Sequence, residues 1–518
     1  MGHEIRIRNF HDGHTLREEL SGREFEAIIM PLVENAIAVA DGALSKAGMD
    51  HSELTSILLA GGTSQIPLVQ DLLEKRFPCG VKIVAKDLMW LIAKGAAIHH
   101  RDLLSHPGEE TQQILGSDLF LETATYGRLE PTLLVPARQT LPHSCFREFP
   151  INTYATDLTI QLLRQSGTDN QEMTSLTRRE ISLNGSHLSK IGVQVRIDVN
   201  KTIKVSVVDP TTKLPLENVE IQGDILNTAE EIRTLRARYG LSDVVSPAVG
   251  SNQRYAIGID LGTTTCEAMV YDMQKKAFSR GLQEPLLSRV FVRAGGMPDF
   301  RKRDDIGNKG HSLENSNHFW NFKVDIGKDI DNAKYHREGK QWAPEILSAY
   351  LLAVIWNDLQ VNFGTETPLY QAVITVPSDF SPDQNALVEK AAKIAGIANP
   401  ITLTEPVAAA LAYNEEYQNI QKPNQNFLIF DFGGGTTDVC IIQTRPNKKI
   451  EELVRNGNNS IGGENLTTAI ADALIDRFAV AHEASYDKLT RDQLRRTLKS
   501  EADEAKVAVS QALAKGED

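Results

Sequence analysis

The spacing of apolar residues predicts a helix, a strand and a second helix near the start of the chain. Over residues 24–48 apolar side chains recur at helical spacing and the run ends at a glycine, which indicates a long amphipathic helix. Residues 56–60 form a short apolar run typical of a buried strand, and Gly61-Gly62 predicts a turn after it. We expect Thr63 or Ser64 to be the N-cap of the following helix. The apolar face of that helix comprises Ile66, Val69, Leu72, Leu73 and Phe77.

The pattern changes twice further along the chain. A polar stretch with the breaker pair Pro107-Gly108 indicates a linker at 105–117. Residues 118–226 contain short runs of alternating polar and apolar residues separated by turn residues, which is typical of an antiparallel β-sandwich. Residues 227–252 are expected to form a short charged helix and then a connector. Over 253–518 strands alternate with helices, which is the pattern of an α/β domain.

Composition restricts the class of protein. The 518 residues suggest about three domains, and a hydrophobic content of 41% is enough for globular cores. The formal net charge of −13 disfavours a nucleic-acid partner, because binding to a polyanion needs clustered Lys and Arg. The four cysteines show no paired spacing, so neither a disulfide framework nor a zinc site is indicated. No apolar run approaches the roughly 18 residues of a membrane-spanning helix, and the first residues do not resemble a secretory signal. We therefore expect a soluble cytoplasmic protein with no membrane partner.

Two segments of the chain resemble each other. Residues 255–265 and 426–437 each contain an apolar strand, an aspartate, glycine and threonine, and each leads into a second apolar strand. Aligned on Asp260 and Asp431, they predict a duplicated β-hairpin in two related lobes. Glycines let backbone N–H groups approach an anion, hydroxyls add donors, and an aspartate at a strand end can hold a hydrated cation. One copy alone is also typical of an ordinary Gly-Thr turn, but two copies facing across a cleft favour a polyphosphate site.

These segments carry a family resemblance. Ile257–Thr265, Ile429–Val439 and Leu59–Pro67 resemble the phosphate-one, phosphate-two and adenosine motifs of the 70-kDa heat-shock (DnaK-type) chaperones, which belong to the actin-like ATPase superfamily. Ile374–Phe380 and Thr404–Tyr413 are similar to further signatures of that family. The resemblance implies an α/β fold with an actin-like (ribonuclease-H-like) two-lobed ATPase domain assembled from both ends of the chain. It also implies that an antiparallel β-sandwich is inserted between these two parts.

The order of the motifs differs from that of the family. There the phosphate-one hairpin comes first, the adenosine motif ends the ATPase domain and the sandwich follows. In this chain, residues 1–104 carry the adenosine motif and resemble the C-terminal part of the ATPase domain, within lobe II. Residues 253–518 carry the phosphate motifs and resemble lobe I and the start of lobe II. The chain therefore resembles a circular permutant, natural or engineered, in which residues 240–253 join the original ends.

The resemblance implies roles for individual residues. Lys323 matches the lysine that reaches the γ-phosphate and the attacking water, and Glu405 matches a carboxylate near the metal and water. Asp260 and Asp431 match aspartates that hold the metal through water, and Asp431 and Thr436 complete the catalytic set with Lys323 and Glu405. The residues expected to contact the nucleotide are Gly262, Thr263, Thr264, Gly433, Gly434, Gly435, Gly463, Asp503, Lys506, Ser510, Gly61, Gly62 and Thr63. Taken alone, a lysine is usually a surface residue, and a glutamate before proline is often only a charge at a helix N-terminus.

The adenosine side departs from the family pattern. Two arginines that usually sandwich the adenine are replaced by Gln65 and Val507. Loss of a stacked guanidinium removes contacts worth about 1–2 kcal/mol each, so we expect weaker or altered nucleotide binding. Trp90 is a candidate replacement for the stacking, although an aromatic residue in an apolar helix is more often part of the core.

The resemblance implies an ATP-dependent chaperone that slowly hydrolyses ATP to control peptide binding by the sandwich. Its cofactors would be ATP or ADP with Mg²⁺, with K⁺ as a further candidate ion. Its partners would be unfolded or extended peptides, co-chaperones and exchange factors. Two alternatives remain at this point: a non-catalytic or weakly catalytic regulator or nucleotide-exchange partner, and a small-molecule kinase of the same superfamily. Coupling between the domains is an open question, because the linker lacks the family's leucines and Asn385 stands where an arginine is expected after Pro377.

Overall fold

The computed structural model describes most of the chain. The described residues are 2–77, 82–84, 88–105, 118–125, 128–136, 139–140, 142–153, 156–165, 173–183, 188–197, 203–217, 233–234, 236–237, 253–293, 297–299, 318–328, 335–337, 340–365, 369–378, 380–416, 422–446, 450–458 and 460–516. The predicted linker after Ser105 and nearly all of the predicted helix and connector at 227–252 lie outside these residues.

Local sequence signals set the first helix and strand. Helix α1 (Gly22–Ala47) begins with a capping box, in which the Ser21 hydroxyl accepts a hydrogen bond from the Glu24 N–H and the Glu24 carboxylate accepts one from the Ser21 N–H. The helix ends where Gly48 adopts a left-handed conformation, with φ 66°. Strand β3 (Ser56–Ala60) has the predicted bounds. The predictions of a long helix and a buried strand are confirmed.

The predicted N-cap is wrong. Thr63 and Ser64 lie in a 3₁₀ turn, η2 (Gly62–Gln65), and helix α2 (Pro67–Arg76) begins after Ile66 without a side-chain cap. The Ser64 hydroxyl donates to the Ala60 carbonyl, and the Thr63 hydroxyl donates to the Gly433 carbonyl. The two hydroxyls predicted to cap the helix are therefore used by a local carbonyl of β3 and by a distant carbonyl of the second hairpin.

Two larger sheets share one plan. The five-stranded sheet has the order β26-β25-β24-β3-β4, and the six-stranded sheet has the order β15-β14-β13-β22-β23, with β16 paired to β14. In each sheet an antiparallel hairpin is followed by two parallel strands. The bounds in the first sheet are β4 (Lys82–Val84), β24 (Asn426–Phe432), β25 (Thr437–Thr444) and β26 (Ile450–Asn458). In the second they are β13 (Tyr255–Leu261), β14 (Thr265–Asp272), β15 (Ala277–Arg280), β16 (Leu286–Leu287), β22 (Gln371–Val376) and β23 (Asn399–Thr404).

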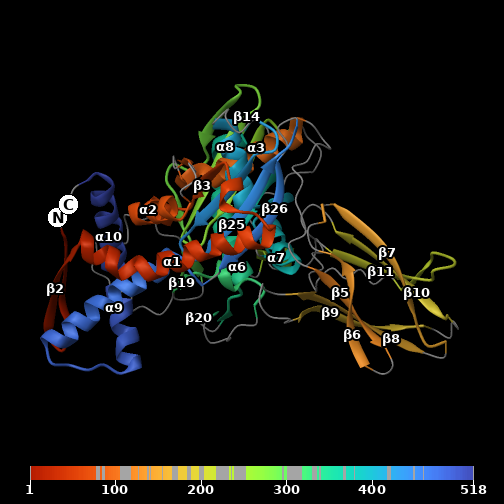
Figure 1. Cartoon of the computed structure of the whole chain (residues 1–518), viewed down its shortest axis with the longest axis horizontal. Coiled ribbons are helices and arrows are strands. Elements are labelled where there is room, and N and C mark those ends of the chain that lie inside the picture. The colour runs from red at the N-terminus through yellow and green to blue at the C-terminus, as the bar shows by residue number, and fades with distance from the viewer. Residues whose placement is uncertain are drawn as a thin grey trace.

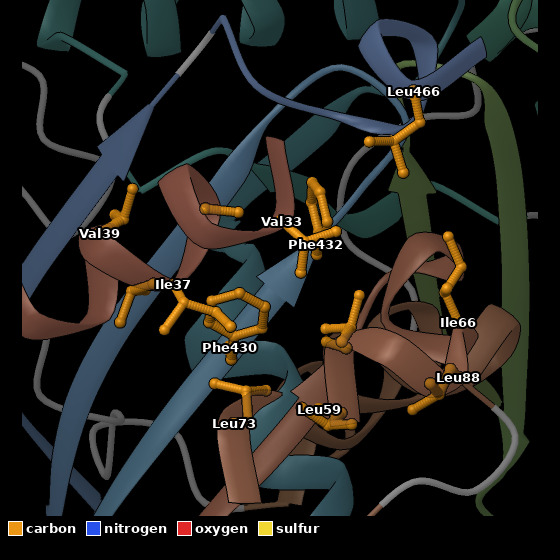
Figure 2. Close-up of a cluster of buried hydrophobic side chains, with 14 of the residues drawn as sticks. Val33, Ile37, Val39, Leu59, Ile66, Leu73, Leu88, Phe430, Phe432 and Leu466 are labelled. Carbon is orange, nitrogen blue, oxygen red and sulfur yellow. The ribbon is translucent and has the colours of Figure 1, made fainter. Parts of the chain in front are cut away.

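Helices cover the sheets and connect them. Helices α3 (Leu88–Ser105) and α8 (Glu405–Glu416) contact strands of both sheets, whereas α6 (Pro344–Phe363) and α7 (Pro382–Ile394) pack on the six-stranded sheet. Figure 2 shows the core of the five-stranded sheet, where Val33 and Ile37 of α1 lie beside Phe430 and Phe432 of β24. Burying large apolar side chains contributes about 1.5–3 kcal/mol each, so this core fixes the strand ends that lead into the second hairpin.

Among the residues that the structure describes, two long helices, α1 and α6, are apolar enough to span a membrane by length and composition alone. In the structure many of their apolar side chains are buried in the protein core. Phe25, Ile29 and Val33 of α1 belong to the core of the five-stranded sheet, and Leu351 and Trp356 of α6 belong to that of the six-stranded sheet.

The predicted antiparallel strands are present between residues 119 and 217. They form two four-stranded antiparallel sheets, β6-β5-β8-β9 and β12-β11-β10-β7, whose buried residues belong to one apolar cluster. Figure 1 shows them extending to one side of the larger sheets. The bounds are β5 (Leu119–Thr125), β6 (Arg128–Val135), β7 (His143–Pro150), β8 (Asp157–Gln165), β9 (Met173–Ser182), β10 (Lys190–Ile197), β11 (Ile203–Val208) and β12 (Pro215–Glu217).

Elements from both ends of the sequence pack together on the opposite side. The β1–β2 hairpin contacts α10, which lies against α9, and Figure 1 shows both ends of the chain there. The bounds are β1 (Gly2–His11), β2 (His14–Ser21), α9 (Gly463–Ala481) and α10 (Lys488–Ala514). The remaining elements are η1 (His51–Glu53), β17 (Arg289–Arg293), β18 (Met297–Asp299), β19 (His318–Trp320), η3 (Lys323–Asp325), β20 (His336–Arg337) and β21 (Lys340–Gln341).

Candidate functional site

The two predicted hairpins are β13–β14 and β24–β25. In the first, Asp260 lies opposite Glu267 across the antiparallel pair. In the second, Asp431 lies opposite Asp438 at the equivalent position. All four carboxyl groups are buried. Each hairpin therefore carries a pair of facing acidic residues beside its glycine-threonine turn.

The tips of the hairpins meet. A Cβ added to Gly434 would lie 1.7 Å from Thr264 Oγ1, and one added to Gly435 would lie 2.6 Å from Thr263 Cγ2. Side chains of the first hairpin thus occupy the space that these glycines of the second leave open. The sequence-predicted phosphate residues of both hairpins lie at one junction.

The other residues of the hairpins that were predicted to contact phosphate lie in the two turns. The Gly433 N–H donates to the Thr436 carbonyl over 3.0 Å, which closes the second turn. The Gly262 carbonyl of the first turn accepts from the Ser288 hydroxyl over 2.6 Å. Thr436 is buried within the junction.

Lys323 and Glu405 form a buried ion pair, with exposed fractions of 4% and 6%. Lys323 begins the turn η3, which follows β19, and Glu405 is the first residue of α8, directly after β23. Burial acts to lower the pKa of Lys323, but the charges of Glu405 and Asp260 outweigh it and raise the pKa. The lysine therefore stays protonated and supplies a fixed positive charge among the carboxylates.

The hairpin aspartates are strongly perturbed. Burial, followed by the charge of Glu405, raises the pKa of Asp260 to about 6. The same two causes raise the pKa of Asp431 well above its usual value. Burial and the charge of Asp260 likewise raise the pKa of Glu267. A cluster of buried carboxyl groups with raised pKa values is typical of sites that bind cations or perform proton chemistry.

The carboxyl chemistry fits a hydrated cation. Asp431 Oδ2 is buried and has no hydrogen-bond partner among the described residues, whereas Asp260 Oδ1 accepts from the Thr375 hydroxyl over 2.5 Å. An unpartnered buried carboxylate oxygen is costly unless a cation or a water completes its coordination. Within the described ranges no group of three or more His, Cys, Asp or Glu residues is arranged to hold a metal directly. Oxygen ligands with retained waters are the coordination that Mg²⁺ prefers.

The predicted adenosine turn abuts the second hairpin. Gly61 has φ 75°, and a Cβ there would lie 2.4 Å from Asp431 Oδ1. The Thr63 hydroxyl donates to the Gly433 carbonyl over 2.8 Å, and the Gly463 N–H donates to the same carbonyl over 3.0 Å. The turn after β3, the second hairpin and the start of α9 thus form one surface. Gly62 is exposed at the edge of this surface, and Met89 Sδ is the atom nearest to a Cβ added there.

Helix α10 extends this surface. Lys506 Nζ donates to the Gly463 carbonyl, the Thr467 hydroxyl and Asp503. Burial acts to raise the pKa of Asp503, but the Lys506 charge and its hydrogen bond lower it overall. The Ser510 hydroxyl donates to the Lys506 carbonyl of its own helix. Lys506 and Asp503 therefore join the start of α9, whereas the Ser510 hydroxyl is used within α10.

The departures from the family pattern are visible in the structure. Gln65 is exposed and Val507 is half-buried. Trp90 of α3 packs against a small apolar cluster that includes Met269 of β14, and the Arg280 guanidinium lies 4.7 Å from its ring centre. Trp90 is therefore partly a core residue, as the more common interpretation of such an aromatic predicts. Cys266 is buried beside Ser288, and burial raises the pKa of its thiol to about 12.

Sequence reasoning missed several residues of the site. Glu267 and Asp438 follow their hairpin aspartates at the same spacing, which was a readable signal. Thr375 and Ser378 hydrogen-bond the carboxylates of Asp260 and Asp438. They come from the end of β22, and no local pattern shows which strand end reaches which carboxylate.

The comparison with protein families agrees with this geometry. The chain matches the family model described as Hsp70 protein over residues 3–243 and 301–516. The fold and site define a mixed α/β protein with two facing phosphate-type hairpins, and the chain belongs to the Hsp70 family, whose members are ATP-dependent chaperones. The resemblance drawn from the motifs is confirmed. The match does not favour the regulator or the small-molecule kinase.

Proposed function

We propose that this chain binds ATP at the junction of its two hairpins, hydrolyses it slowly and thereby controls peptide binding by its β-sandwich. The observation that carries the proposal is the buried Lys323–Glu405 pair, which lies among the aspartates of both hairpins. Structural proteins rarely bury so many carboxyl groups with one lysine, because each buried charge costs free energy.

Phosphoryl transfer to water requires neutralisation of phosphate charge and an oriented nucleophile. Lys323 would donate hydrogen bonds to the terminal phosphate and to the attacking water, while Glu405 orients the lysine and the water. Thr264 Oγ1 is buried without a hydrogen-bond partner among the described residues, so it can donate to a phosphate oxygen. Thr263 and Thr436 would add hydroxyl donors. Backbone N–H groups of the glycine turns would complete the cradle.

Magnesium would be held by Asp260 and Asp431 through water, with Glu405 nearby. When bound, it would neutralise the β- and γ-phosphate oxygens, as cations do in phosphoryl-transfer sites. Potassium is a second candidate ion at the same carboxylates. On the adenosine side Lys506 and Asp503 would contact the ribose, without the arginine stacking of relatives. We therefore expect weaker nucleotide binding than a complete clamp would give.

The two sheets with a common plan support the actin-like, two-lobed interpretation of residues 1–104 and 253–518. Strand β3 precedes β24 in the sequence by hundreds of residues yet pairs with it, as the permuted motif order requires. The two four-stranded antiparallel sheets with a common apolar cluster support the proposed β-sandwich, in which an extended peptide would bind through main-chain hydrogen bonds and a side-chain pocket. Co-chaperones, exchange factors and a cytoplasmic location follow as further proposals from the family.

Single-turnover hydrolysis of ATP with Mg²⁺ tests this function. Lys323→Ala and Asp431→Asn should each lower the rate by about 100-fold or more, because each removes a charge that acts on the reacting phosphate. The control is Lys275→Ala, which changes an exposed lysine in the turn after β14. Rates that stay equal to the parent in both site variants would reject the site. Peptide anisotropy with and without ATP then tests control of the sandwich.

A further inference from the structure

A second buried ion pair lies close to the second hairpin. Arg455 and Glu452 of β26 are 2.5 Å apart, and their side chains are 9% and 1% exposed. Burying two charges costs several kcal/mol of desolvation, and the attraction between them often does no more than offset this. Stability alone is a weak reason for such a pair, so its other contacts are informative.

A β-bulge creates the pair. Residues three apart on a regular strand point to opposite faces of the sheet. Here the register shifts, so that Glu452 lies opposite Ile442 and Arg455 lies opposite Cys440. Because Cys440 and Ile442 share one face of β25, the bulge at Leu453 brings both charged side chains to that face. Asp438 lies on the same face, two residues before Cys440.

The guanidinium of Arg455 reaches from the five-stranded sheet to the other sheet. Its Nη1 donates to the Ser378 carbonyl over 2.8 Å, and Ser378 lies just after β22 of the six-stranded sheet. Ser378 in turn donates its N–H and its hydroxyl to Asp438 Oδ1, over 3.2 and 2.9 Å. A chain of polar contacts thus runs from Glu452 through Arg455 and Ser378 to Asp438.

The end of this chain lies in the phosphate hairpin. Asp438 faces Asp431 across the β24–β25 pair. Its charge contributes to raising the pKa of Asp431, after the larger contributions of burial and of Glu405. It also contributes to raising the pKa of Lys323, after the larger contributions of Glu405 and Asp260 and against the effect of burial. The orientation of the Asp438 carboxylate therefore affects the field in which Asp431 and Lys323 act.

We propose that Arg455 is a positioning residue for ATP hydrolysis: it fixes Ser378 so that the serine holds Asp438 beside Asp431, and it joins the two sheets at the reacting phosphate. This proposal rests on the function proposed above. Arginine suits the role because its planar guanidinium can pair with Glu452 and donate to a carbonyl simultaneously, which a lysine ammonium does with less geometric control. The bulge at Leu453 is the local feature that makes this possible.

The test compares rates and affinities of full-length variants. Removing only Arg455 would leave Glu452 buried and unpaired and could unfold the protein, so the variant of choice is the double substitution Glu452→Met with Arg455→Met. An apolar replacement of a whole buried pair is commonly neutral or stabilising. The matched control is Arg445→Met with Glu451→Met, because this second ion pair also involves a residue of β26, Glu451, but is partly exposed.

For the double variant we expect the single-turnover rate to fall about tenfold while the dissociation constant for Mg·ATP changes less than about twofold, the signature of a lost transition-state interaction. Ser378→Ala should give a similar loss, and Arg455→Lys should recover part of the rate. The control pair should keep the parental rate. A parental rate in both the double variant and Ser378→Ala, with the parent active, would overturn the role of Arg455 alone. A parent that does not hydrolyse ATP would overturn both this role and the proposed function.

Discussion

The two hairpins have the same strand arrangement, but they contribute different chemical groups to the candidate site. The first, β13–β14, contributes side chains at its tip: Thr263 and Thr264 lie where Gly435 and Gly434 of the second leave room. The second, β24–β25, contributes backbone and a carboxylate oxygen of Asp431 that has no partner among the described residues. At the point where the tips meet, the first hairpin contributes threonine side chains and the second contributes glycines, so the two copies are complementary in shape.

The largest expected effect comes from filling that space. Gly434→Ala should lower the free energy of unfolding by about 1–3 kcal/mol, because the new Cβ would collide with Thr264. Gly433→Ala is the matched control, since its Cβ would lie 3.6 Å from the nearest atom, an ordinary contact. Urea denaturation without nucleotide measures both. Equal losses in the two variants would show that the hairpin tips do not meet as described.

A second difference concerns the hydrogen bond that joins a helix to the sheet of each hairpin. On the first, His100 Nδ1 of α3 accepts from the Ile257 N–H over 2.8 Å. On the second, the Tyr413 hydroxyl of α8 donates to the Leu59 carbonyl of the neighbouring strand. Burial lowers the pKa of His100 to about 4 from a usual value of 6.5, so in the folded protein this contact is protonated only in acid.

The unfolded chain therefore binds a proton at His100 that the folded protein excludes, and stability is lost as pH falls from about 6.5 to about 4. At pH 5 the contribution of His100 to this loss is about 2 kcal/mol. His100→Asn keeps an acceptor for the Ile257 N–H without the titration. Unfolding free energies at pH 7.5 and pH 5 should thus differ less in the variant than in the parent. An unchanged pH dependence would contradict the assignment.

The smallest expected effect comes from removing the Thr375 hydroxyl, which donates a hydrogen bond to Asp260 of the first hairpin. Thr375→Val should destabilise the protein by about 1–2 kcal/mol, because Asp260 Oδ1 loses its buried donor. Thr468→Val removes an exposed hydroxyl that bonds within α9, so its cost should stay within about 0.5 kcal/mol. Thermal denaturation compares the two. A loss at Thr375 no larger than at Thr468 would mean that the hydroxyl does not support Asp260.

Much of this arrangement could be predicted from local sequence. The helix over 24–48, the strand at 56–60 and both hairpins follow from periodicity and from the repeated order of aspartate, glycine and threonine. The cap at Thr63 or Ser64 could not be predicted correctly, because the carbonyls of Gly433 and Ala60 compete for those hydroxyls. The partners of Lys506 and the Arg455–Ser378 contact were also inaccessible. The contacts of Lys506 with Gly463 and Thr467 and that of Arg455 with Ser378 join segments far apart in the sequence. The Arg455 contact also depends on a β-bulge that has no sequence signature.

The central claim is that both hairpins bind the polyphosphate of the same nucleotide. Calorimetric titration of the full chain with Mg·ATP tests it most directly, with Asp260→Asn and Asp431→Asn as separate variants. We predict one nucleotide bound per chain and an affinity loss of about tenfold or more in each variant, because each removes a cation-holding carboxylate from the shared site. Parental affinity in either variant, or two independent sites per chain, would contradict the claim.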